Sequence, residues 1–108
     1  MIRKICFDVD GTLITTDKDP QPRKDVLSLL YSFHKLGWQI WVHSGGGVSY
    51  ASHWVQKLEL DKDMMVHLAP KGSPDHEYDI AVDDAIDPTV VVDNGTRYYV
   101  KAKYFINV

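Results

Sequence analysis

The sequence predicts an α/β fold with a mostly parallel central sheet. Short apolar runs alternate with two segments in which apolar residues recur at helical spacing. Polar residues follow where the apolar runs end, as in parallel sheets that bind ligands outside the carboxyl ends of their strands. The chain of 108 residues is 44% hydrophobic and 25% charged, which suits a single domain over residues 1–108 and argues against disorder.

Two strand–helix units make up the first half of the chain. The first strand is almost entirely apolar beyond Lys4, as expected for a central parallel strand that is covered on both faces. Pro22 suits the first turn of a helix, and Gly37 is placed as its stop. In the second unit, a glycine run after Ser44 separates the strand from the helix. We expect these elements at residues 2–8, 22–36, 38–43 and 50–60.

The second half is expected to contain strands without further helices. A loop with two prolines leads from a short third strand into a fourth apolar strand. A C-terminal β-hairpin is expected around Asn94-Gly95, because this dipeptide favours a type I′ turn. We expect these strands at residues 64–68, 80–82, 89–92 and 96–100.

Two carboxylates mark the end of the first strand. Because side chains alternate along a strand, Asp8 and Asp10 point to the same side. Repulsion between such acids costs stability unless a cation or a shared proton compensates. Asp83 and Asp84 follow the fourth strand in the same way. Two acid-tipped strands therefore predict a divalent metal site, and oxygen ligands favour Mg²⁺.

Four short motifs resemble those of the haloacid dehalogenase (HAD) superfamily of phosphatases and phosphotransferases. Residues 8–12 resemble its first motif, residues 42–44 its second motif and residues 83–84 its fourth, acidic motif. Lys71 is the best match to the lysine of the third motif, with Lys62 as the alternative. The motifs occur in the family's order with strand–helix units between them.

The resemblance, which covers about residues 2–88, implies both a fold and an activity. The implied fold is a Rossmann-like three-layer sandwich, and the implied activity is magnesium-dependent phosphatase chemistry through an aspartyl-phosphate. Asp8 would be the nucleophile, and Asp10 would be the general acid and base as well as a metal contact through its backbone carbonyl. The connections after the first two strands are too short for a cap domain, so we expect an open, capless site.

The resemblance also implies roles for the other strand-end residues. Ser44 and Lys71 would act in catalysis and bind the phosphoryl group, together with Gly45 and Gly46. The metal would be held by Asp8, Asp10, Asp83 and Asp84, with either of the last two as the direct ligand. The histidines show no metal-ligand spacing and are expected to be structural or solvated, although His43 neighbours Ser44 and could touch substrate.

Three functions remain open at this point. The first is a capless magnesium-dependent phosphatase acting on an unidentified phosphorylated substrate. The second is a polynucleotide-end or phosphoprotein phosphatase, since an open site admits large substrates, although a net charge of −3 disfavours nucleic acid. The third is a non-catalytic binding or regulatory domain with the same fold, which the intact set of four acids argues against.

The sequence also bears on location and assembly. The single cysteine, Cys6, cannot form an intrachain disulfide and fits a reducing, cytoplasmic setting. No signal peptide or membrane-spanning apolar run is visible, so no membrane partner is expected. The short C-terminal part could leave a sheet edge for a homodimer, with contacts from Tyr98, Tyr99 and Tyr104.

Overall fold

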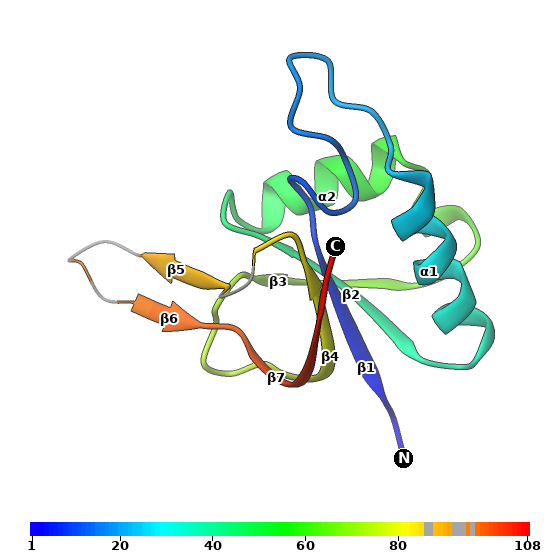
Figure 1. The fold of residues 1–108 in the computed structure, drawn as a ribbon. Helices are drawn as coiled ribbons and strands as arrows, with labels where there is room; N and C mark the ends of the chain where they lie inside the picture. Colours follow the sequence, from blue (N-terminus) through cyan, green and yellow to red (C-terminus); the bar gives the residue numbers. More distant parts are fainter. Residues whose placement is uncertain (86–87, 92–94, 96) are drawn as a thin grey trace.

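The computed structural model describes residues 1–85, 88–91, 95 and 97–108. Its elements are β1 (Lys4–Asp8), α1 (Lys24–Lys35), β2 (Gln39–Ser44), α2 (Val48–Lys57), the 3₁₀ turn η1 (Leu60–Lys62), β3 (Val66–Pro70), β4 (Glu77–Asp83), β5 (Thr89–Val91), β6 (Arg97–Tyr99) and β7 (Lys101–Asn107). Five strands form one sheet in the order β3-β2-β1-β4-β7, and every neighbouring pair is parallel (Figure 1). The α/β prediction with a parallel sheet is confirmed.

Strand β1 lies in the centre of this sheet and sets the alignment of the strand ends. Asp8 and His43 are Cα partners across β1 and β2. On the other side of β1, Phe7 is the partner of Val82, so Asp83 ends β4 beside Asp8. Because the strands are parallel, their carboxyl ends meet at one edge of the sheet. The residues that follow β1, β2 and β4 are therefore brought together.

Helices α1 and α2 pack against the same face of the sheet. Leu30 of α1 and Trp54 of α2 share one buried cluster with Phe7 of β1. Cys6 points to the opposite face because side chains alternate, and it belongs to a separate, smaller cluster with Tyr78. The expected three-layer sandwich is therefore wrong for the described residues. The crossovers from β1 to β2 and from β2 to β3 advance in the same direction, and right-handed crossovers then place both helices on one side.

The strand pairing after β4 differs from the expected ending. Strand β5 pairs antiparallel with β6, but part of the expected turn, Asn94, lies outside the described residues. The chain then continues into β7, which pairs parallel with β4 at the edge of the sheet. Strand β7 was not expected from the sequence, because Lys101 and Lys103 alternate with Ala102 and Tyr104 and no continuous apolar run marks a buried strand. The antiparallel pair of β5 and β6 is thus followed by a further parallel strand.

The element boundaries also show how the loops at the site are built. Strand β3 begins two residues later than expected, and Met64 fills the core from the turn before it. Residues 9–23, between β1 and α1, contain two isolated bridges but no helix or longer strand. In the part of the chain that the structure describes, no helix combines the length and apolar character needed to cross a membrane.

Candidate functional site

A tight turn fixes the geometry after β1. The amides of Thr12, Leu13 and Ile14 all donate to the Val9 carbonyl, over 3.1, 3.0 and 3.2 Å. Gly11 has φ of 78°, a conformation that residues with a Cβ rarely adopt. A Cβ at Gly11 would also collide with the Asp84 carboxylate. Glycine is therefore required where the turn after β1 meets the end of β4.

Lys71 joins the two acidic strand ends. Its Nζ lies 3.2 Å from Asp8 Oδ1 and 2.8 Å from Asp83 Oδ2. The three side chains are only 12%, 7% and 3% exposed, so the ion pairs are largely shielded from water. Lys62, the alternative lysine, instead pairs with the exposed Glu59. The structure thus brings Lys71 to the acids, and Lys62 lies in a surface ion pair.

Asp83 and Asp84 occupy different surroundings. The buried Asp83 carboxylate contacts Lys71 through Oδ2 and accepts the Ala85 amide through Oδ1, at 2.9 Å. The exposed Asp84 lies with its Oδ1 3.4 Å from Thr12 Oγ1, and its amide donates to the same Oγ1 at 3.1 Å. Of the two acids, Asp83 is the one directed toward Asp8.

Thr12 lies at the candidate site, although its role was not expected from the sequence. Its side chain is fully buried, and its Oγ1 lies 3.5 Å from Asp8 Oδ2 as well as close to Asp84. The hydroxyl therefore connects the end of β1 to the end of β4. Its place in the first motif, directly after Gly11, is the sequence signal that could have identified it.

His43 lies inside the acidic cluster. It is 1% exposed, and neither ring nitrogen has a hydrogen-bond partner among the described residues. Ligand atoms of Asp8, His43 and Asp83 all lie within 4.8 Å of one another. No histidine was expected as a metal ligand, because the histidines are not spaced along the chain like metal ligands. This group forms instead through the register between neighbouring strands. The pairing of His43 with Asp8 across parallel strands is the signal that could have found it.

Asp10 stands apart from this buried group. Its side chain is exposed, and the Tyr50 hydroxyl donates to Asp10 Oδ1 at 2.7 Å. This hydrogen bond raises the pKa of Tyr50. Tyr50 begins the helix expected over residues 50–60, and in the structure it lies in the first turn of α2 and contacts the Asp10 carboxylate.

Ser44 ends β2 and leads into α2. Its side chain is 3% exposed, and its Oγ accepts the Gly46 amide at 3.0 Å. The Gly47 amide donates to the Ser44 carbonyl at 3.0 Å, and Gly47 has φ of 96° immediately before the helix. Accepting the Gly46 amide uses a lone pair of Ser44 Oγ and not its proton, so the hydroxyl can still donate to another acceptor. Gly45 is exposed beside it.

Burial and nearby charges together shift the pKa values of Asp8, Lys71 and His43. Burial raises the pKa of Asp8 to about 7, because Lys71 opposes this effect only in part and Asp83 adds to it. Burial disfavours the charged form of Lys71, yet its pKa is raised because Asp83 and Asp8 contact the ammonium. Burial also lowers the pKa of His43 to about 4, which leaves a neutral imidazole at pH 7.

Two buried carboxylates therefore face one lysine and one neutral histidine. The donor set, which consists of carboxylate oxygens and an imidazole nitrogen, fits a divalent cation. Asp8 and Asp83 would hold that cation with His43 beside them. Asp10 and Asp84 were also expected to contact the metal, Asp10 through its backbone carbonyl. In the structure the Asp10 carboxylate contacts Tyr50, and the Asp84 carboxylate contacts Thr12.

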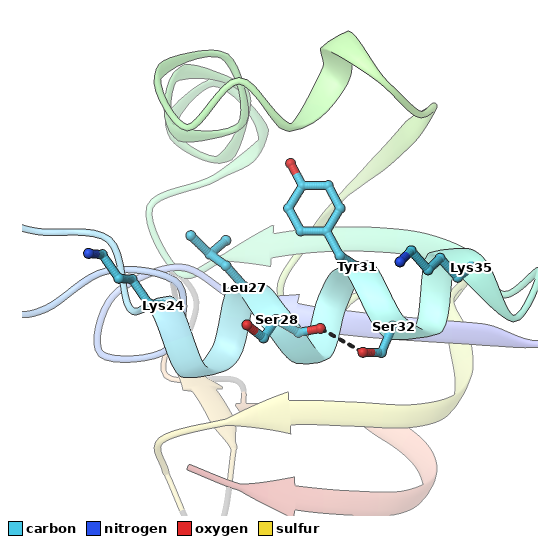
Figure 2. A pocket seen from close by; sticks show the side chains of 6 residues that line it. All are labelled: Lys24, Leu27, Ser28, Tyr31, Ser32 and Lys35. Atoms are coloured by element: carbon cyan, nitrogen blue, oxygen red, sulfur yellow. Dashed lines mark hydrogen bonds between the residues drawn. The ribbon is translucent and has the colours of Figure 1, made fainter.

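A surface pocket lies elsewhere, along α1. Figure 2 shows its lining, which comes entirely from that helix and includes the hydrogen bond from Ser32 Oγ to the Ser28 carbonyl at 2.9 Å. The lining contains none of the strand-end acids, so it has no part in the cluster around Asp8. The lining residues are Lys24, Leu27, Ser28, Tyr31, Ser32 and Lys35.

Comparisons with known proteins add no assignment. No protein-family model, curated protein or solved structure matches this chain. The motifs and the geometry of the strand ends are therefore the basis for a function.

Proposed function

We propose that the protein is a HAD-like phosphatase that hydrolyses phosphomonoesters with the help of a divalent cation. One observation carries this proposal: Lys71 holds the buried Asp8 and Asp83 together where β1 and β4 end. A carboxylate in this position is a suitable nucleophile for a phosphoryl group, because an adjacent cation screens the repulsion between two anions. Sites of parallel sheets also lie at these strand ends.

The first half-reaction uses Asp8 and Asp10. A carboxylate oxygen of Asp8 attacks phosphorus, the bond to the leaving oxygen breaks, and Asp10 gives its proton to that oxygen. The product is an aspartyl-phosphate at Asp8. Tyr50 supports this role because its hydroxyl donates to one oxygen of Asp10, whose side chain is exposed.

The second half-reaction restores the site. Asp10 takes a proton from water, the water oxygen attacks phosphorus, and the bond between phosphorus and Asp8 breaks to release phosphate. Lys71 neutralises charge on the phosphoryl oxygens, and the Ser44 hydroxyl donates to one of them. A bound divalent cation, with Mg²⁺ expected from the oxygen ligands, would supply further neutralisation of the phosphoryl charge.

The proposed substrate is large or held by few contacts. The connection over residues 9–23 carries no inserted domain, and Asp10 is exposed to solvent. Few groups can surround a small phosphoester at such an open site, so remote binding energy is limited. Polynucleotide ends and phosphoproteins therefore belong in the first substrate panel, beside nucleotides and sugar phosphates.

Phosphate release from this panel, measured with Mg²⁺ and with Mn²⁺, tests the proposal. Asp8→Asn should lower turnover at least about 100-fold, because an amide is a far poorer nucleophile. Asp17→Asn, which changes an exposed acid of the 9–23 connection, is the matched control and should leave turnover unchanged. Acid-quenched wild-type protein should carry one phosphoryl group that Asp8→Asn lacks.

The opposite outcomes are equally informative. Substantial turnover by freshly purified Asp8→Asn would refute the covalent mechanism. If the wild-type protein hydrolyses no member of the panel with either cation, the result favours a non-catalytic binding domain with the same fold.

A further inference from the structure

His43 has no role in the proposed reaction, although it occupies the centre of the site. It is 1% exposed, and both ring nitrogens lack partners among the residues that the structure describes. Buried polar groups in folded proteins are almost always satisfied. A buried imidazole with two free nitrogens therefore requires an explanation.

Packing does not supply that explanation. The His43 ring meets Tyr78 edge-on, with centroids 5.9 Å apart and an interplanar angle of 86°. A phenylalanine ring could make this contact without burying two polar nitrogens. The imidazole must therefore be needed for its nitrogens.

The neighbours of His43 indicate what those nitrogens bind. One ligand atom from each of Asp8, His43 and Asp83 lies within 4.8 Å of the others, and the residues come from three adjacent strands. Lys71 contacts Asp8 Oδ1, and Thr12 Oγ1 lies 3.5 Å from Asp8 Oδ2, so each oxygen of this carboxylate keeps a lone pair for a cation. The Lys71 ammonium is thus paired with the carboxylates of Asp8 and Asp83, and the His43 imidazole lies beside the same two carboxylates.

We propose that His43 is a nitrogen ligand of the cation at this site, and that the site therefore prefers a first-row transition-metal dication over Mg²⁺. Imidazole binds Mn²⁺, Fe²⁺, Co²⁺ and Zn²⁺, whereas Mg²⁺ prefers oxygen ligands and retains its waters. This inference shares its cation site with the proposed phosphatase but does not depend on catalysis. It replaces the expectation of Mg²⁺ as the preferred cation.

Electron paramagnetic resonance of bound Mn²⁺ tests the inference without any substrate. Electron spin-echo modulation from ¹⁴N should be present in the wild type and absent in His43→Gln. The matched control is His67→Gln, since His67 is half-buried on β3, stacks on Trp41 and lies outside the acidic group. The control should retain the nitrogen modulation.

Calorimetry supplies the second readout. His43→Gln should weaken Mn²⁺ binding by at least roughly 10–100-fold, the range found for residues that only support a metal ligand, and should change Mg²⁺ binding much less. Wild-type protein should bind Mn²⁺ more tightly than Mg²⁺. If His43→Gln does not fold, the wild-type spectrum and the wild-type affinities decide the question alone.

The outcomes separate this inference from the proposed function. Mn²⁺ bound without nitrogen modulation, or Mg²⁺ bound as tightly as Mn²⁺, would overturn the inference and leave the phosphatase proposal intact. Nitrogen-coordinated Mn²⁺ in a protein that hydrolyses no phosphoester would support the inference and reject the phosphatase. Failure to bind either cation would overturn the inference and remove the cation from the proposed function.

Discussion

Lys71→Met should destabilise the cation-free protein in a pH-dependent way. Lys71 is the cation in contact with two carboxylates whose side chains are 7% and 3% exposed. Removing one partner of a buried ion pair costs about 3–5 kcal/mol, because the remaining charge stays buried without compensation. Methionine keeps the length of the apolar stem, so the loss arises mainly from the missing charge.

The pKa of Asp8 sets the direction of the pH effect. In the folded protein this pKa is raised from 3.8 to about 7. Between these two pH values, Asp8 therefore keeps a proton in the folded state that it has released in the unfolded state. The contribution of Asp8 to stability is therefore present below pH 3.8 and is lost as the pH rises through 7. Loss of Lys71 raises this pKa further and extends the destabilisation to higher pH.

Urea unfolding in the presence of a chelator, followed by far-ultraviolet circular dichroism, provides the measurement. We expect Lys71→Met to lower the free energy of unfolding by about 3 kcal/mol at pH 8 and by about 1–2 kcal/mol at pH 6, where proton uptake by Asp8 offsets the loss. Lys62→Met is the control, because Lys62 belongs to an exposed pair and should show no measurable change. A Lys71→Met loss below about 1 kcal/mol at pH 8, or one independent of pH, would refute the argument.

Three further predictions follow from the same geometry. Gly11→Ala should lower the free energy of unfolding in urea by at least about 1 kcal/mol more than Gly37→Ala. Both glycines have positive φ, but only at Gly11 would a Cβ collide with a carboxylate. Equal losses for the two variants would contradict this close contact. The pKa of His43 is lowered from 6.5 to about 4, so its contribution to stability is present above pH 6.5 and is lost as the pH falls toward 4. His43→Phe should reduce the loss of unfolding free energy between pH 7 and pH 5. An unchanged dependence of this free energy on pH would reject the lowered pKa of His43. Tyr50→Phe should lower kcat several-fold with little change in unfolding, since it frees the exposed Asp10; unchanged kcat would exclude the orienting role.

Local sequence signals predicted the scaffold of the site. Alternation of apolar runs with helical periodicity indicated parallel strands, and acids at the ends of two such runs indicated that Asp8 and Asp83 would meet. These signals suffice because a parallel sheet aligns its strand ends whatever the details of packing. The sequence favoured Lys71 but left Lys62 as an alternative, because only three-dimensional contacts show which lysine reaches the acids.

The remaining features depend on relations between distant segments. His43 reaches Asp8 through the β1–β2 register, and Tyr50 reaches Asp10 from a helix 40 residues further along the chain. The number of layers depends on strand order, which the alternation of elements does not specify. Strand β7 was missed because an edge strand with exposed lysines lacks the continuous apolar run of a central strand.

The central position of β1 has a consequence for biosynthesis. One neighbour, β2, follows soon after β1, but the contact between the Lys4 amide and Asp79 in β4 joins residues 75 positions apart. At about 5–20 residues per second, the ribosome needs roughly 4–15 s to make that intervening length. During this interval the nascent chain carries Asp8 without Asp83 and with one edge of β1 open. The acidic cluster around Asp8 can therefore form only once β4 has emerged and closed that edge, and the proposed cation site forms with it.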